Sequence, residues 1–164
     1  MSLAAPGGAT RLVLIRHGEA QGNREMRYLG STDVPLTARG WTQAEQVAGA
    51  LARFHVEAIY SSPLARAMLT AQAIAQVAGH PVVVEAGLRE TAYGNWEGLT
   101  RAEVASSTPD ALRQWEVDPE VAPPGAGESL RATQLRIVKC VGALSLRHPD
   151  ATLALVSHVG PIKL

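Results

Sequence analysis

The sequence predicts a three-layer α/β/α fold, in which helices cover both faces of a mainly parallel sheet. Strand-like and helix-like segments alternate along the chain, as is typical of parallel sheets. Residues 11–15 and 152–156 are mostly aliphatic, as expected of strands buried on both faces. Hydrophobic residues make up 46% of the 164 residues, which is enough for a sizeable core. We predict a flexible tail over 1–9 and a single domain over 10–164.

The first strand, over residues 11–15, leads into a polar, glycine-containing loop over residues 18–35. A helix is predicted over 37–53, because its apolar residues recur at helical spacing and share one face. This buried face comprises Ala44, Val47, Ala48 and Leu51.

A second strand is predicted over residues 57–60, followed by a second helix. Ser62 is a suitable N-cap for this helix, and Pro63 suits its first position. The helix ends at Gly79, and a third strand follows over 81–84. The predicted buried stripe of the helix comprises Leu64, Ala67, Ala71, Ile74 and Ala78.

Residues 87–127 are predicted to form an irregular, lid-like segment with one or two short helices. A long amphipathic helix then begins at Gly127 or Ser129 and continues to Arg147. A His-Pro-Asp sequence ends it, and the last strand follows over 152–156. The inward-facing residues of the helix are Leu130, Ile137, Val141 and Leu144.

The C-terminal residues predict the opening of one more helix at Gly160, after the last strand. A strand as apolar as residues 152–156 needs cover on both faces. Leaving such a face exposed would cost several kcal/mol, at about 25 cal/mol per Å² of apolar surface. We therefore expect the fold to be truncated at Leu164, with a helix and a strand missing. An uncovered face would favour association into a homo-oligomer.

Composition excludes several classes of function. The chain has 15 basic and 15 acidic residues, so no net field attracts nucleic acid or an anionic membrane. No apolar run approaches membrane-spanning length, and residues 1–9 lack the pattern of a signal peptide. Cys140 is the only cysteine, which excludes an internal disulfide. We expect a cytoplasmic protein without nucleic-acid or membrane partners.

Two of the predicted strands end in a histidine. Arg16, His17 and Gly18 follow the first strand, and His158 follows the last. A lone histidine at a strand end more often has a structural role, but the adjacent cation and glycine favour chemistry here. Neutral imidazole is a nucleophile, neighbouring cations favour its neutral form, and glycine lets a backbone N–H approach an oxyanion. The pattern predicts a site that binds and attacks an anion.

Arg66 lies near the start of the second helix, where unpaired N–H groups attract anions. Glu90 and Glu97 both follow the third strand and suit a general acid, and spacing alone does not decide between them. The sequence has no phosphate-binding GxxxxGK[ST] loop and no HExxH or clustered carboxylates, so we expect no metal and no cofactor. We expect structural roles for the remaining histidines, which are His55, His80 and His148.

The ordered set of motifs resembles the histidine phosphatase superfamily, the phosphoglycerate mutase-like proteins. The resemblance extends over nearly the whole chain. It rests on Arg16-His17-Gly18-Glu19 with Asn23, Asp33-Val34-Pro35-Leu36-Thr37, Ser61-Ser62-Pro63-Leu64 with Arg66, Leu88-Arg89-Glu90, Gly94-Asn95-Trp96-Glu97-Gly98, Gly127-Glu128-Ser129 and Val156-Ser157-His158.

This resemblance implies a metal-independent reaction in which His17 forms a phosphohistidine. It also implies that Glu90, rather than Glu97, is the proton donor. Two arginines and a histidine would supply the positive charge that Mg²⁺ supplies in other phosphoryl-transfer enzymes. The phosphoryl oxygens would be held by Arg16, Arg66, His158 and Asn23.

The compact segment from Glu90 to His158 resembles the small phosphatases, such as α-ribazole phosphatase, more than the mutases. We therefore expect a phosphomonoester hydrolase acting on a small metabolite. Phosphoglycerate mutase-type transfer is the alternative, followed by a non-catalytic phosphate-binding protein. The chain departs from the family at Val159, where a small residue is usual and a branched side chain would crowd the pocket.

Substrate selectivity is expected to come from the loop after His17 and from residues 93–115. Tyr28, Tyr93 and Trp96 suit either ring stacking or simple packing. The expected substrate contacts are Arg16, Gly18, Gln21, Asn23, Tyr28, Arg66 and Arg89.

Overall fold

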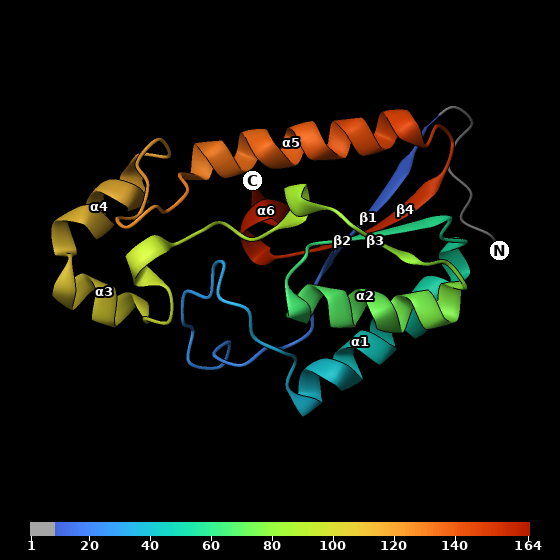
Figure 1. The fold of residues 1–164 in the computed structure, drawn as a ribbon, viewed down its shortest axis with the longest axis horizontal. Coiled ribbons are helices and arrows are strands. Elements are labelled where there is room, and N and C mark those ends of the chain that lie inside the picture. The colour runs from blue at the N-terminus through green and yellow to red at the C-terminus, as the bar shows by residue number, and fades with distance from the viewer. Residues whose placement is uncertain (1–8) are drawn as a thin grey trace.

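The structure, a computed structural model, describes residues 9–164 and places helices on both faces of a four-stranded parallel sheet (Figure 1). Helix α5 lies along one face of the sheet, and helices α1 and α2 lie along the other. The predicted fold class is therefore confirmed. The predicted tail over 1–9 lies outside the described residues except for Ala9.

The sheet consists of β1 (Arg11–Arg16), β2 (Ala58–Ser61), β3 (Val82–Val84) and β4 (Thr152–Ser157), in the spatial order β1-β4-β2-β3. Every neighbouring pair is parallel. Arg16 pairs with Ser157, and Ser61 pairs with Val156. This register brings the carboxyl ends of three neighbouring strands to one edge, where parallel α/β sheets bind ligands.

The two aliphatic strands differ in burial, and the prediction that β1 is buried on both faces is wrong. Every residue of β4 is buried, whereas Leu14 in β1 is 49% exposed. The reason is position: β4 lies between β1 and β2, while β1 is at an edge of the described sheet.

The lower layer in Figure 1 consists of α1 (Ala38–Leu51) and α2 (Ala65–Ala78). Thr37 caps α1 by accepting a hydrogen bond from the N–H of Gly40, and a short 3₁₀ helix (Ala52–Phe54) extends it close to the predicted end. Both helices bury small side chains against the sheet. The main buried members of this core are Ala44, Ala48, Leu51, Ala67, Ala71 and Ile74.

The prediction that Ser62 caps α2 is wrong. The helix starts at Ala65, and the side chain of its N-cap residue Leu64 makes no capping bond. The cap comes from a distant loop instead: Asp33 Oδ1 accepts a 2.7 Å hydrogen bond from the N–H of Ala65. The predicted end at Gly79 is confirmed, since this glycine has a φ of +74°, which a side chain would disfavour.

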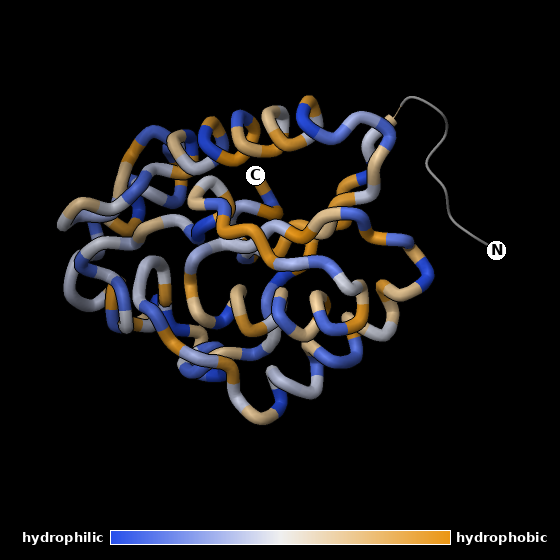
Figure 2. Tube along the Cα trace, turned by 45° about the vertical axis from the view of Figure 1, so that its right-hand side comes forward, coloured by the Kyte–Doolittle hydropathy of each residue, from blue (hydrophilic) through white to orange (hydrophobic). Residues whose placement is uncertain are grey.

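The upper layer consists mainly of α5 (Leu130–Arg147), whose N-cap is Ser129, one of the two predicted starts. Ile137 and Leu144 are buried in a second core cluster against the sheet, and Val141 is half-buried beside them. In Figure 2 hydrophobic residues concentrate along the strands, and the helices alternate in hydropathy. Within residues 9–164, no helix is long and apolar enough to cross a membrane.

The segment between β3 and α5 extends to one end of the molecule (Figure 1). It contains 3₁₀ helices at Ala86–Leu88 and Gly94–Trp96 and two short helices, α3 (Arg101–Ser107) and α4 (Pro109–Val117), as predicted. A third core cluster holds it together around the fully buried Trp96. After β4, the predicted final helix is present as α6 (Val159–Lys163).

Candidate active site

The ends of neighbouring strands bring together the two histidines that the sequence analysis selected. His17 follows β1 and His158 follows β4, and both side chains are buried. Their ring centroids lie 5.0 Å apart, with the rings inclined at 60°. The backbone N–H of His17 donates to the carbonyl oxygen of Ser157, so the parallel pairing continues into the site.

One nitrogen of His17 is occupied by the backbone. Nδ1 lies 2.7 Å from the carbonyl oxygen of Gly18, which can only accept a hydrogen bond. Nδ1 therefore carries the proton, and Nε2 carries the lone pair. Burial lowers the pKa of His17 to about 4, with help from the charges of Arg66 and Arg16 and against the bond to Gly18. At neutral pH the ring is thus uncharged, with Nε2 suited to act as a nucleophile.

Gly18 fits a space that no other residue can occupy. A Cβ atom built on it would overlap the backbone oxygen of Gly40, at the start of α1. Its N–H donates 3.1 Å to Oγ1 of Thr70 in α2, and that hydroxyl donates to the carbonyl oxygen of Arg66. The turn after His17 is therefore held between the two lower helices.

Arg66 is almost fully buried, with 1% of its surface exposed. Its two terminal nitrogens donate to the carbonyl oxygens of Thr32, at 2.7 Å, and Gly30, at 2.8 Å. Its Nε is buried without a hydrogen-bond partner. Burial lowers the pKa of Arg66, and the charges of Glu90 and Asp33 oppose that shift. The guanidinium is therefore fixed in position, with Nε–H and the second N–H of each terminal nitrogen left for a ligand.

Glu97 supports the loop that holds Arg66. Its Oε1 accepts hydrogen bonds from the N–H groups of Ser31, at 2.7 Å, and Tyr93, at 3.2 Å. Its Oε2 accepts a 2.8 Å bond from the hydroxyl of Thr32. These three hydrogen bonds fix the loop whose carbonyl groups bind Arg66, so Glu97 has a structural role.

Glu90 is the carboxylate that lines the same cavity as His17. It is 6% exposed, and its Oε1 accepts a 2.9 Å bond from the N–H of Thr91. Burial raises the pKa of Glu90, although bonds from the backbone of Thr91 and Gly160 and the charge of Arg66 act against this. A raised pKa favours the protonated carboxyl group, which can donate a proton.

His17, Arg66 and Glu90 line one cavity of about 280 Å³, whereas His158 is fully buried behind His17 and does not line it. Asn23 borders it, with Oδ1 bound to the N–H of Ala20 at 2.8 Å, so its amide nitrogen is the part left for a ligand. Among residues 9–164, no group of three or more His, Cys, Asp or Glu side chains could hold a metal ion. The cavity is lined by Arg16, His17, Asn23, Met26, Arg27, Tyr28, Leu29, Arg66, Glu90, Tyr93 and Val159.

Residues 12–164 match the family model of the histidine phosphatase superfamily, branch 1. The chain belongs to this family. The resemblance noted from the sequence motifs is thus confirmed over nearly the whole chain.

Histidine phosphatases and related proteins match the chain closely. It is 41% identical over 161 residues to a bifunctional protein of Mycobacterium tuberculosis, covering 98% of this chain and 44% of that protein. The chain therefore spans less than half the length of that relative. A mycobacterial glucosyl-3-phosphoglycerate phosphatase, solved with VO3, aligns with a TM-score of 0.85 and 36% identity, covering 93% of this chain and 76% of that one. The α-ribazole phosphatase of Shigella flexneri aligns with a TM-score of 0.84 and 32% identity. The alignment covers 94% of this chain and 76% of that one.

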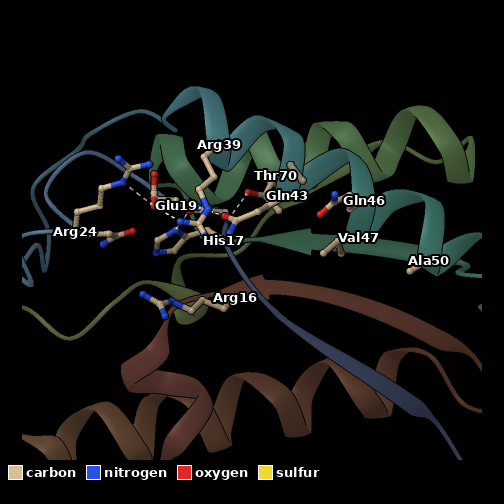
Figure 3. A pocket seen from close by; sticks show the side chains of 13 residues that line it. Arg16, His17, Glu19, Arg24, Arg39, Gln43, Gln46, Val47, Ala50 and Thr70 are labelled. Atoms are coloured by element: carbon tan, nitrogen blue, oxygen red, sulfur yellow. Dashed lines mark hydrogen bonds and ion pairs between the residues drawn. The ribbon is translucent and has the colours of Figure 1, made fainter.

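A second cavity, of about 620 Å³, adjoins the first along α1 (Figure 3). The two cavities share Arg16, His17 and Asn23, and Gly18 lines the second. Figure 3 shows Arg24 and Arg39 reaching toward Glu19 from different elements. Their side chains lie 3.2 Å and 3.7 Å from the Glu19 carboxylate, so both arginines are already paired.

Two residues expected to contact the substrate lie elsewhere in this histidine phosphatase fold. Gln21 borders neither cavity beside His17, and its N–H donates to the carbonyl oxygen of Pro35. Arg89 points to Glu128, 3.3 Å away, and lines neither cavity. Gln21 and Arg89 therefore border neither cavity at His17.

Sequence reasoning missed the contribution of α5. Arg136 donates to the carbonyl oxygens of Gly87, at 2.8 Å, and Arg89, at 3.0 Å, and more weakly to that of Glu90. Its guanidinium also pairs with Glu128 at 2.6 Å. Arg136 therefore fixes the backbone that carries Glu90. In the sequence, Arg136 is recognisable only as an arginine next to the apolar face of a predicted helix.

Proposed function

We propose that this chain forms the catalytic part of a phosphatase that hydrolyses small phosphomonoesters through a phosphohistidine at His17. The observation that carries the proposal is the state of the His17 ring. Its Nδ1 is bound to the backbone, its pKa is low, and His17 lines a cavity together with Arg66 and Glu90. A neutral nucleophile, cations and an acid are the groups that metal-independent transfer of a phosphoryl group requires.

In the first step, Nε2 of His17 attacks phosphorus in line with the bond to the leaving oxygen. The N–P bond forms, the P–O bond breaks, and Glu90 gives its proton to the leaving alcohol. The non-bridging oxygens are held by Arg16, Arg66, Asn23 and His158.

In the second step, water attacks the phosphohistidine and the N–P bond breaks. Glu90, now a carboxylate, takes a proton from the water, and inorganic phosphate leaves. The same group acts as acid and then as base, which suits a carboxyl group whose pKa is raised toward the working pH. The positive charge that stabilises the transferring group comes from Arg16 and Arg66.

The substrate proposed for this site is a small metabolite with a partly apolar organic group. The cavity wall beyond the charged residues contains Tyr28 and Tyr93, whose ring centroids lie 4.7 Å apart, together with Met26 and Leu29. Glucosyl-3-phosphoglycerate phosphatase and α-ribazole phosphatase, by name, also act on phosphorylated small molecules. Both support a hydrolase, with mutase-type transfer as the alternative.

The test is a phosphoryl-trapping assay with a ³²P-labelled phosphomonoester, quenched in alkali to preserve phosphohistidine. We expect label on the wild-type protein and on the His80→Ala control, because His80 is an exposed histidine outside the site. We expect none on His17→Ala. Undiminished hydrolysis by His17→Ala would contradict the proposal, and transfer to an acceptor alcohol exceeding release of phosphate would favour the mutase.

A further inference from the structure

The second histidine of the site has a buried serine as its partner. Ser62 follows β2, is fully buried, and places Oγ 2.8 Å from Nε2 of His158. The N–H of Leu64 donates to the same Oγ at 3.3 Å. Ser62 therefore contributes to the site through its hydroxyl rather than by capping α2.

The hydrogen bonds of Ser62 determine which ring nitrogen of His158 carries the proton. A serine hydroxyl has one proton to donate and can accept two hydrogen bonds. Leu64 uses one acceptor position of Ser62. Among the described residues, Nε2 of His158 is the one recorded acceptor for the hydroxyl proton. If Nε2 carried a proton instead, the serine proton would be buried without an acceptor, which is unfavourable.

The other nitrogen of His158 then carries a proton that lacks a partner. Nδ1 is buried and makes no hydrogen bond in the described structure. The ring lies beside His17, with centroids 5.0 Å apart. Burial and the charge of Arg66 lower the pKa of His158 to about 2, so the ring stays neutral and Nδ1–H is its single donor. An oxyanion bound beside His17 would provide the acceptor that this group lacks.

We propose that Ser62 is a positioning residue that holds His158 as its Nδ1–H tautomer, so that this N–H donates to a phosphoryl oxygen bound beside His17. The phosphoryl oxygen in this proposal rests on the function proposed above. The tautomer itself does not, because it follows from the hydrogen bonds that Ser62 makes with His158 and Leu64.

The first experiment reads the tautomer directly, by ¹⁵N NMR of the histidine side chains at neutral pH. We expect the His158 proton on Nδ1 in the wild type and a mixture of both tautomers in Ser62→Ala. Ser61→Ala is the matched control, since Ser61 is equally buried but donates to a carbonyl oxygen 2.9 Å away. This control should keep the proton on Nδ1. A wild-type proton on Nε2 would overturn the proposal whether or not the protein is a phosphatase.

The second experiment asks whether Ser62 acts through His158. Ser62→Ala should weaken binding of inorganic phosphate and lower kcat by about tenfold to a hundredfold, as loss of one oriented donor predicts. In a His158→Gln background, the same change should have no further effect on phosphate binding. An equal loss in both backgrounds would mean a general structural role and would overturn the proposal.

The thermal midpoint of each variant shows whether it is folded. Should Ser62→Ala fail to fold, Ser62→Cys keeps a side chain of similar shape with a much weaker donor. It should shift the tautomer in the same direction. An unchanged tautomer in a folded Ser62→Cys protein with weakened phosphate binding would count against the proposal.

Discussion

Gly160 lies against Glu90 with no room between them for a methyl group. A Cβ built on Gly160 would overlap Oε1 of Glu90 and come within 3.0 Å of Oγ1 of Thr91. The Gly160 backbone also hydrogen-bonds the Glu90 carboxylate. The turn after β4 therefore sets the position of the carboxyl group. From the sequence we expected crowding at Val159, which borders the cavity, but the tight contact with Glu90 belongs to Gly160.

Replacing Gly160 by alanine should therefore displace the proposed acid. We expect Gly160→Ala to lower kcat about tenfold to a hundredfold for alkyl phosphates, since loss of a positioned general acid costs about that much or more. Aryl phosphates with good leaving groups should lose less, because their oxygens need less protonation. Steady-state kinetics with both substrate classes measures the difference.

The matched control is Gly142→Ala, on the exposed side of α5. A Cβ at Gly142 meets nothing within 4 Å, and alanine is the better helix former by up to about 1 kcal/mol. This variant should keep wild-type kinetics and a slightly higher melting temperature. Equal losses for alkyl and aryl phosphates in Gly160→Ala would mean that the acid is not the group affected.

The two glutamates of the sequence analysis should give different kinetic signatures. Glu90→Gln removes the proposed proton donor, so its rate loss should grow with the pKa of the leaving alcohol. Glu97→Gln loosens the loop whose carbonyl groups hold Arg66, so it should raise KM similarly for every substrate. A series of phosphomonoesters with graded leaving groups separates the two patterns. A steep dependence in Glu97→Gln would reverse the assignment.

The strand ends of the site could be predicted because they depend on local pattern and on a general rule of parallel sheets. Aliphatic runs ending at Arg16 and Ser157 suffice to predict two strands, and their parallel pairing brings His17 and His158 together. The helix ends at Gly79 and Ser129 also follow from local chemistry.

The supporting contacts could not be predicted because their partners are distant in sequence. Asp33 caps a helix that starts 32 residues later, and Arg136 binds a backbone more than 45 residues earlier. Local preference suggested Ser62 for that cap, but a tertiary contact with His158 engages its hydroxyl. The exposure of Leu14 depends on strand order, which the composition of a strand does not encode.

Because Asp33 caps α2 from a distant loop, replacing it should destabilise the protein. Asp33→Ala removes the acceptor for the N–H of Ala65 and should lower the free energy of unfolding by about 1 kcal/mol. Asp33→Asn keeps a side-chain oxygen and should retain most of that stability. Urea unfolding followed by circular dichroism gives the comparison. A loss in Asp33→Asn as large as in Asp33→Ala would point to the charge rather than the cap.

The two buried histidines predict that stability falls in mild acid. In the unfolded chain, histidine binds a proton below pH 6.5, whereas burial lowers the native pKa to about 4 for His17 and about 2 for His158. Between pH 6.5 and about 4 the unfolded state therefore binds more protons than the native state. The free energy of unfolding is highest above pH 6.5 and decreases as the pH falls through this range. Each histidine contributes at most about 1.4 kcal/mol per pH unit.

Urea unfolding at pH 7 and pH 5 tests this linkage in the wild type, His17→Gln and His158→Gln. Each variant should lose less stability than the wild type between the two pH values, because glutamine does not titrate. Glu90 acts in the opposite direction, since a raised native pKa favours proton uptake by the folded state, but it is common to all three proteins. The difference between wild type and variant therefore isolates the histidine. An identical pH dependence in all three proteins would show that both rings take up protons as easily in the native state as in the unfolded one.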